Sequence, residues 1–231
     1  MKTKIFCDIA DKNLIRKFNK KKIIKGFTTN PSLMRQAGAY DYRKYCKDIL
    51  KICKKPISFE VFADDYKQMR TQALKINEWG KNIYVKVPVV NSKGFFTGKL
   101  IKDLNSRKIK LNITAVYNAV QTKRILENIN KKTKVIISIF AGRAADAGKD
   151  PIPEFKKSLK LAKKFSNVEI LWASVREPYN YLQAKQLGCH IITIPPKIIE
   201  KIENNQKSYN KLTIDTVKGF LIDSKKSKFK L

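Results

Sequence analysis

The feature that most constrains this chain is a repeated alternation of short apolar runs with amphipathic segments. Residues 5–10 form an apolar run, and the following segment, 11–20, carries Leu14, Ile15 and Phe18 at helical spacing. Further apolar runs lie at 26–30, 57–62, 84–90, 111–116, 135–140, 170–176 and 190–194. The amphipathic segments that follow them lie at 42–54, 64–79, 98–107, 118–130, 153–165, 178–187 and 196–202. Eight successive strand–helix units predict an α/β fold, the closed parallel (β/α)8 barrel.

An open doubly wound sheet shows the same alternation and is the competing fold. Such a sheet would use a phosphate or dinucleotide loop rich in glycine. The segment 142–149 resembles a phosphate-binding loop, but five residues separate its glycines and Asp150 stands where serine or threonine is required. The chain also lacks a G-x-G-x-x-G sequence, so the barrel is favoured.

Length and composition fit a single domain over residues 1–231 with a C-terminal helix and basic tail at about 213–231. The chain has 231 residues, and 43% of them are hydrophobic. No apolar stretch approaches the length of a membrane span, and residues 1–4 lead directly into the first strand, so we expect neither a membrane partner nor a signal peptide. The four cysteines form no C-x-x-C pair, which favours the cytoplasm.

The formal charge of +31 has two interpretations. Surface lysines neutralise phosphates well, so one interpretation is a nucleic-acid-binding protein. The other is a lysine-rich surface on which only a few cations meet a small phosphorylated substrate. The basic residues are spread along the whole chain without a recognised nucleic-acid motif. We therefore expect no specific nucleic-acid partner, only nonspecific polyanion binding at low salt.

Lys86 is a lone ammonium inside the apolar run 84–90. Burial disfavours the charged form of lysine, so its pKa should fall and leave a neutral amine that can attack a carbonyl. This is Schiff-base chemistry. The alternative is a lysine that pairs with a carboxylate or extends toward solvent from the strand end.

Other predicted strands also carry polar residues near their C-terminal ends. Side chains alternate along a strand, so residues two apart face the same side. Asn112 and Thr114, Ser138 and Phe140, and Ser174 and Arg176 form such pairs. The remaining polar residues at strand ends are Asp8, Thr28, Asn30 and Glu60. Because the C-terminal strand ends form the active site of this barrel, these residues are candidates for it. Individually, Thr28 could be a turn residue and Ser138 a core hydroxyl.

His190 is the only histidine, and it begins a strand instead of ending one. A Ser-His-Asp triad or a multi-histidine metal site therefore cannot be built. We predict that His190 is a packing residue, and that the protein uses no metal and no cofactor.

Several motifs resemble those of the transaldolases. They lie at 8–10 (Asp-Ile-Ala), 26–33 (Gly-Phe-Thr-Thr-Asn-Pro-Ser-Leu), 85–88 (Val-Lys-Val-Pro), 111–114, 138–143, 173–176 and 193–196. The resemblance covers essentially the whole chain in the right order, and the Thr-Thr-Asn-Pro-Ser block together with the lysine strand is highly specific. The length resembles the shorter bacterial and archaeal branch, which includes the fructose-6-phosphate aldolases.

The resemblance implies a class I aldolase-like barrel in which Lys86 forms a Schiff base with a ketose phosphate. It implies that Asp8 is the acid/base, and that Glu60 and Thr114 hold the water that Schiff-base formation releases and consumes. The implied binding residues are Asn30, Asn112 and Ser138 for hydroxyls, Thr28 as support for Asn30, and Arg143, Ser174 and Arg176 for the phosphate.

The implied function is a transaldolase of the non-oxidative pentose phosphate pathway. It would transfer a dihydroxyacetone unit from sedoheptulose 7-phosphate or fructose 6-phosphate to an aldose phosphate. Glu60 and Phe140 resemble the transferases, whereas the aldolase branch carries glutamine and tyrosine there. An aldolase that releases free dihydroxyacetone, an aldolase for another sugar phosphate and a polyanion-binding barrel remain alternatives.

Two further segments carry expectations. In the short branch, C-terminal segments commonly reach a neighbouring subunit, so we expect a homo-oligomer built through the helix at 214–222 and a tail with Phe229 and Leu231. The segment 89–98 is longer than in the shortest relatives, and we expect its aromatic residues to reshape the acceptor pocket.

Overall fold

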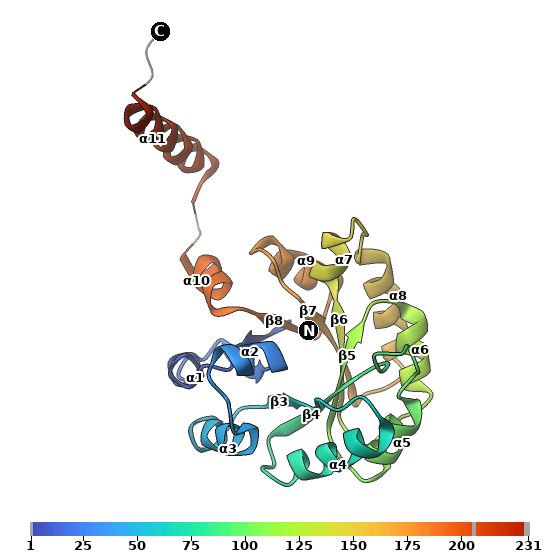
Figure 1. The fold of residues 1–231 in the computed structure, drawn as a ribbon. Helices are drawn as coiled ribbons and strands as arrows, with labels where there is room; N and C mark the ends of the chain where they lie inside the picture. Colours follow the sequence, from blue (N-terminus) through green and yellow to red (C-terminus); the bar gives the residue numbers. More distant parts are fainter. Residues whose placement is uncertain (1, 205–206, 229–231) are drawn as a thin grey trace. The chain divides into compact units, whose positions relative to one another are not determined.

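The computed structural model describes residues 2–204 and 207–228 and shows a closed barrel of eight parallel strands (Figure 1). Each strand pairs with its neighbours in sequence, and β8 pairs with β1. The predicted (β/α)8 barrel is therefore confirmed. The strands are β1 (Lys4–Asp8), β2 (Ile24–Thr28), β3 (Ile57–Glu60), β4 (Ile83–Pro88), β5 (Leu111–Val116), β6 (Val135–Phe140), β7 (Val168–Ala173) and β8 (Ile191–Ile194).

Helices follow the strands and surround the barrel (Figure 1). Side-chain caps begin several of them: Asp11, Asp41 and Asp65 each accept a hydrogen bond from a backbone N–H of the first turn. The helices of this layer are α1 (Lys12–Asn19), α2 (Pro31–Gln36), α3 (Tyr42–Ile52), α4 (Tyr66–Asn77), α5 (Gly98–Ser106), α6 (Ala119–Leu126), α7 (Ala141–Asp146), α8 (Ile152–Ala162) and α9 (Tyr179–Leu187). A further helix, α10 (Pro196–Asn204), follows β8 in the chain.

Two short helices were not predicted. α2 and α7 have six residues each, too few for an apolar face at helical spacing to be recognised. Both directly follow a strand end, α2 after Asn30 and α7 after Phe140. They therefore place backbone and side chains beside the C-terminal mouth of the barrel.

The chain divides into two compact units, residues 1–199 and 200–231. The second unit contains α11 (Tyr209–Ser227), longer at both ends than predicted, and Ser208 caps its first turn. Every residue of α11 is described, and none is buried. Phe229 and Leu231 lie outside the described residues, and the assignment of all 231 residues to one domain stays a prediction. In the part of the chain described here, no helix is both long and apolar enough to cross a membrane.

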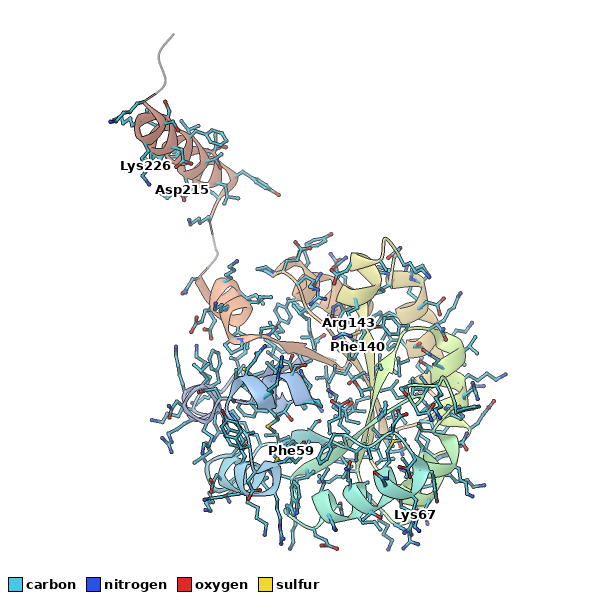
Figure 2. All side chains as sticks on the ribbon, viewed as in Figure 1. Phe59, Lys67, Phe140, Arg143, Asp215 and Lys226 are labelled. Carbon is cyan, nitrogen blue, oxygen red and sulfur yellow. The ribbon has the colours of Figure 1, made fainter. Side chains whose placement is uncertain are left out.

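Outward-facing strand residues pack between the barrel and the helices. Phe59 on β3 is fully buried in this layer, whereas Lys67 lies on the exposed side of α4 (Figure 2). The four cysteines are also buried, and none forms a disulfide. His190 lies just before β8, where its Nδ1 accepts a hydrogen bond from the backbone of Ile170 at 3.0 Å, and burial lowers its pKa. It is thus held at the N-terminal end of the barrel, as a packing residue.

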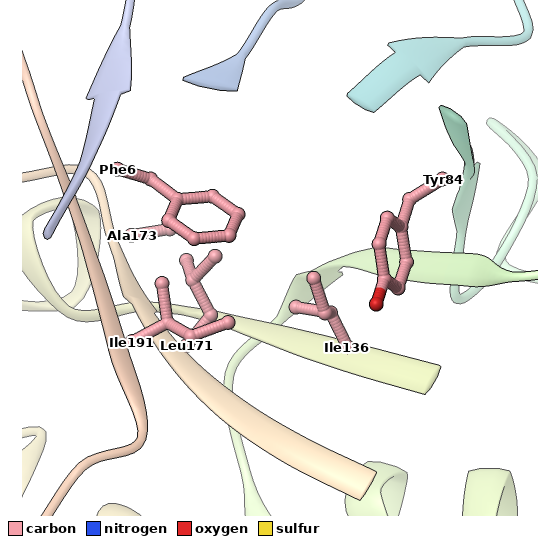
Figure 3. Close-up of a cluster of buried hydrophobic side chains, with 6 residues drawn as sticks. All are labelled: Phe6, Tyr84, Ile136, Leu171, Ala173 and Ile191. Atoms are coloured by element: carbon pink, nitrogen blue, oxygen red, sulfur yellow. The ribbon is translucent and has the colours of Figure 1, made fainter. Parts of the chain in front are cut away.

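The interior of the barrel holds an apolar cluster contributed by five strands (Figure 3). Its members are Phe6, Tyr84, Ile136, Leu171, Ala173 and Ile191. Gly26 makes room for it, because a Cβ there would lie 2.6 Å from the Phe6 ring. The cluster fills the barrel, so any ligand must bind beyond it.

Candidate active site

A cavity of about 190 Å³ lies at the C-terminal ends of the strands. Ten of the twelve residues that line it are predicted site residues, contributed by strands all around the barrel. They are Asp8, Thr28, Asn30, Lys86, Thr114, Ser138, Phe140, Arg143, Ser174 and Arg176. Ala173 and Thr193 complete the lining and were not predicted, whereas the predicted residues Glu60 and Asn112 are not part of it.

Lys86 lies at the centre of the polar contacts. It is 6% exposed, and its Nζ lies 3.0 Å from Oε2 of Glu60 and donates to the carbonyl of Thr29 at 3.0 Å. The ion pair is set by strand register, because Glu60 and Lys86 are direct partners across β3 and β4. Lys86 is therefore buried as predicted, and it has the carboxylate partner that we considered as the alternative.

Glu60 is in turn positioned by Tyr42, a residue that sequence reasoning missed. The Tyr42 hydroxyl donates to the backbone carbonyl of Glu60 at 2.9 Å and accepts from its backbone N–H at 3.1 Å. Burial raises the pKa of Tyr42, so the phenol stays protonated and can keep both bonds. The helix α3 thereby holds the end of β3 on which the lysine's partner sits.

Asp8 forms a second polar group with two threonines. Thr28 donates to Oδ1 of Asp8 at 2.6 Å, and its hydroxyl lies 2.5 Å from that of Thr193. Burial raises the pKa of Asp8, although the Thr28 hydrogen bond and the Lys86 charge both act to lower it. We expected Thr28 to support Asn30; that expectation is wrong, because β1, β2 and β8 bring its hydroxyl to Asp8 and Thr193 instead.

Thr114 contributes a hydroxyl without a partner. Its Oγ1 is buried at the cavity wall and makes no hydrogen bond to any residue that the structure describes. The next residue, Ala115, has a φ of 58°, and the β5–β6 register shifts at this point. A buried polar atom without a partner is costly, so this hydroxyl is suited to a ligand or water in the cavity.

Asn112 supports the lining from behind. Its Nδ2 donates to Ser58 at 2.9 Å, and its Oδ1 accepts from Ser138 at 2.7 Å. Asn112 is fully buried, and Ser138 presents its oxygen to the cavity. We predicted that Asn112 binds a ligand in the cavity, but the structure does not bring its side chain to the cavity wall. Asn112 lies below the strand end, where Ser58 and Ser138 engage its side chain.

Asn30 has two tasks. Its Oδ1 accepts from the backbone of Leu33 at 2.9 Å and caps α2. Because the oxygen is engaged in the cap, the Nδ2 donors are what the side chain can offer to the cavity that it lines.

The two arginines lie where β6 and β7 end. Arg143 belongs to α7, and its guanidinium carbon lies 5.6 Å from the centre of the Phe140 ring (Figure 2). Arg176 donates from its Nε to Oδ2 of Asp146 at 3.1 Å. Ser174 directly follows β7 and has a φ of 64°, so the strand ends at Ala173. Simple alternation thus stops before Arg176, although both Ser174 and Arg176 line the cavity.

The segment 89–98 does not contribute to the lining, contrary to expectation. It folds back on itself, with a bridge between Val90 and Phe96, and Ser92 is bonded to Asp64 through its backbone and its hydroxyl. Phe96 packs under the guanidinium of Arg124 at 4.0 Å, so it points into the helical layer. Phe95 is exposed.

A larger cavity, of about 480 Å³, lies in the helical layer between α3 and α4. Its wall includes an aromatic group, Tyr42, Phe62 and Trp79, beside charged and polar side chains of α3 and α4. It does not contain Lys86 or the partners of Lys86, so the smaller cavity is the candidate active site. Among residues 2–204 and 207–228, no three His, Cys, Asp or Glu side chains are grouped as metal ligands.

Comparisons with known proteins show the family of this chain. Residues 5–231 match the family described as transaldolase/fructose-6-phosphate aldolase. A probable transaldolase from Herpetosiphon aurantiacus is 32% identical over 95% of this chain and 94% of its own, and one from Clostridium kluyveri is 34% identical over 85% and 87%. The structure of orotidine 5'-monophosphate decarboxylase from Metallosphaera sedula shares the fold alone, with a TM-score of 0.55 at 12% identity over 87% of this chain and 98% of that one. With a lysine, two carboxylates and two arginines gathered at one barrel mouth and a family match over nearly its full length, this chain belongs to the transaldolase/fructose-6-phosphate aldolase family.

Proposed function

We propose that the protein is a transaldolase that carries a dihydroxyacetone unit on Lys86. The observation that carries this proposal is the Lys86 amine, buried 3.0 Å from the Glu60 carboxylate in a cavity also lined by Arg143 and Arg176. A lysine amine attacks a ketone, and guanidinium groups bind a phosphate. The substrates are thus ketose and aldose phosphates, such as sedoheptulose 7-phosphate and fructose 6-phosphate, and no cofactor is needed.

The first step is Schiff-base formation. The Lys86 ammonium gives a proton to Glu60, and the resulting amine attacks the C2 carbonyl of the ketose. The C=O π bond opens, and a proton passes from nitrogen to the oxygen, which gives a neutral carbinolamine. Proton return to the C2 hydroxyl expels water and leaves an iminium. The water can stay bound between Glu60 and the unpartnered hydroxyl of Thr114.

Carbon–carbon cleavage then uses Asp8 as base. The C4 hydroxyl gives its proton to Asp8, the C3–C4 bond breaks, and its electron pair moves into the iminium to form an enamine. Burial raises the pKa of Asp8, which suits a group that takes a proton and returns it to the incoming aldehyde. Asn30 and Ser138 line the same cavity and are placed to hold hydroxyls of the three-carbon unit.

Transfer and simple release differ in the fate of the enamine. Protonation of the enamine carbon would free dihydroxyacetone, and Phe140 at the cavity wall offers no proton. Addition to an aldehyde gives transfer. The aldolase that releases dihydroxyacetone is the second candidate, and a phenol at position 140 would favour it.

Trapping tests the proposal. Incubation with fructose 6-phosphate and borohydride should add one reduced sugar-derived adduct, which peptide mass spectrometry should locate at Lys86. Lys110 is a control, because burial lowers its pKa but it stands directly before β5, at the N-terminal end of the barrel. An adduct at another lysine would reject the assignment of Lys86 as the nucleophile. The absence of any adduct would favour the alternative of a polyanion-binding barrel.

A second experiment separates the two enzymes. Erythrose 4-phosphate and fructose 6-phosphate should give sedoheptulose 7-phosphate and glyceraldehyde 3-phosphate far faster than fructose 6-phosphate alone releases dihydroxyacetone. Phe140→Tyr should move the balance toward release. If the unmodified protein releases dihydroxyacetone as fast as it transfers the dihydroxyacetone unit, the transaldolase proposal is wrong and the protein is an aldolase.

We further propose a homo-oligomer in the cytoplasm. α11 exposes Leu212, Val217 and Phe220 along a helix without buried residues, and a partner subunit would cover them. The four cysteines form no disulfide, which fits a reducing compartment. Light scattering at micromolar concentration should show an oligomer, and a monomer there would contradict this assembly.

A further inference from the structure

Asp146 and Arg176 form an ion pair beside the cavity, although they are thirty residues apart. Arg176 donates through Nε to Oδ1 at 3.3 Å and to Oδ2 at 3.1 Å, and its Nη2 also contacts Oδ2. A guanidinium has five N–H donors. This pairing engages the Nε–Nη2 edge, so both protons of Nη1 and one of Nη2 remain for another acceptor.

The guanidinium of Arg176 has no other side-chain partner within the described residues. The side chains of Arg176 and Asp146 are 49% and 53% exposed, so packing does not hold this group in one rotamer. The backbone N–H of Arg176 is fixed separately, by Oδ1 of Asn180 at 2.9 Å. The direction of the guanidinium therefore depends on the carboxylate of Asp146.

Close backbone packing makes the pairing possible. A Cβ on Gly142 would lie 1.7 Å from the carbonyl oxygen of Ser174 and 3.0 Å from Cγ of Arg176. The first turn of α7 thus lies against the stem of Arg176, and Asp146, one turn further along α7, meets its head. Ser174 and Arg176 line the cavity, whereas Asp146 does not.

The charge of Asp146 fits a role in orienting Arg176 better than a role in attracting a phosphate. Hydrogen bonds from Arg176, with the charge of Arg143 as a smaller contribution, hold the pKa of Asp146 below its usual range, so the carboxylate is ionised at neutral pH. It cancels one positive charge where the proposed function needs to bind a phosphate monoester. A carboxylate at this position is useful only if it orients the arginine.

We propose that Asp146 is a positioning residue, which holds the Nε–Nη2 edge of Arg176 so that the free Nη1 edge is presented to a phosphate monoester in the cavity. This inference rests on the proposed function, because that function supplies the phosphate. Asp146 itself does not touch the ligand. It acts only through Arg176.

Titration calorimetry with inorganic phosphate, at constant ionic strength, tests the inference without requiring turnover. Arg176→Ala should weaken phosphate binding roughly tenfold and Asp146→Ala roughly threefold to fivefold. The double variant should bind no more weakly than Arg176→Ala alone, since the carboxylate has no effect without the arginine. Asp48→Ala removes an exposed carboxylate from a lysine pair on α3 and controls for the change in net charge.

The outcomes separate the two proposals. If Asp146→Ala binds phosphate more tightly than Asp48→Ala does, Asp146 competes with phosphate for Arg176 instead of positioning it. If the losses of the two single variants add in the double variant, the two side chains act independently, which also contradicts the positioning role. If Arg176→Ala binds phosphate as well as the unmodified protein does, the phosphate end of the proposed function fails. Asp146→Asn, which keeps one acceptor for Arg176, should bind phosphate between the unmodified protein and Asp146→Ala.

Kinetics give an independent readout. Asp146→Ala should raise KM for fructose 6-phosphate with little change in kcat, because the carboxylate orients the phosphate-binding arginine and lies away from the lysine. A purely structural role would lower the melting temperature and affect kcat. A fall in kcat with unchanged KM would overturn the positioning role.

Discussion

Two neighbouring layers inside the barrel have opposite character. One layer consists of Phe6, Tyr84, Ile136, Leu171 and Ile191, which pack into the apolar cluster. Two residues further along four of these strands stand Asp8, Lys86, Ser138 and Thr193, which line the cavity. Two residues of strand correspond to about 6.6 Å. A single step of alternation therefore separates the side chains that fill the barrel from those placed for chemistry.

The comparison shows how a stable barrel can hold an unfavourable site. The apolar layer is buried and well packed, so it contributes stability. In the polar layer, burial raises the pKa of Asp8 and the Thr114 hydroxyl has no partner. Such groups cost free energy in the folded state. The layer beneath offsets that cost, and substitutions in the two layers should therefore have opposite consequences.

The largest effect should come from Lys86→Met, at the centre of the polar layer. Transfer should fall by roughly 10⁴-fold or more, as expected when a covalent nucleophile is lost. Circular dichroism should show an intact barrel, because the apolar layer is unchanged. Lys86→Met/Glu60→Gln removes the unpaired carboxylate as well and should be as inactive as the single variant. Residual turnover close to that of the unmodified protein would move the chemistry to another residue.

Leu171→Ala should do the opposite in the layer beneath. Truncating this fully buried leucine should lower the free energy of unfolding by about 2–5 kcal/mol, measured by urea denaturation. The folded fraction should still form the borohydride adduct at Lys86. Leu182→Ala on the exposed side of α9 is the matched control and should change stability little. A loss of trapping in folded Leu171→Ala protein would mean that the two layers are not separable.

Thr114→Val should sharpen the comparison, because valine has nearly the same shape without the hydroxyl. Removing an unpartnered buried hydroxyl should raise the free energy of unfolding by about 1 kcal/mol. Transfer should become slower, since the proposed water loses one of its partners. Thr122→Val, whose hydroxyl bonds Ser158 at 2.9 Å, should instead lower stability. Equal losses of stability in both variants would show that the Thr114 hydroxyl is satisfied in solution.

The smallest effect should be a pH-dependent gain in stability for Asp8→Asn. The folded pKa of Asp8 is raised, so the folded state binds its proton more tightly than the unfolded state does. The unmodified protein therefore loses stability as pH rises from the usual value of 3.8 through the raised pKa. Asp8→Asn should be more stable than the unmodified protein at pH 7, and the difference should vanish below pH 3.8. Denaturation curves across this range measure it. A variant less stable at pH 7 would contradict the cost of burying Asp8.

Much of the fold and of the site could be predicted from local patterns. Apolar runs and helical spacing identified the eight strands and their helices, because these periods depend on residues close together in the chain. Alternation along β6 placed Ser138 and Phe140 on the same face, and the structure puts both at the cavity wall. The same rule applied to β3 and β8 could have found Ser58 and Thr193, two residues that sequence reasoning left out.

Contacts between distant segments were not predictable in the same way. The hydrogen bonds of Tyr42 to Glu60, of Thr28 to Asp8 and of Arg176 to Asp146 each join residues 18 or more positions apart. Local sequence contains no information on which of several polar neighbours a side chain will meet. The left-handed conformation of Ser174 and the short helix α7 also depend on packing against each other, through Gly142.

The sequence by itself thus determined which residues face the barrel interior and in what order they come, because period and composition are properties of each strand. Only the tertiary structure decided which of them touch. Closure of eight strands sets the register that places Glu60 beside Lys86, and burial around Asp8 sets its proton affinity. Both are products of the whole barrel, since pairing and desolvation exist only when distant segments pack together.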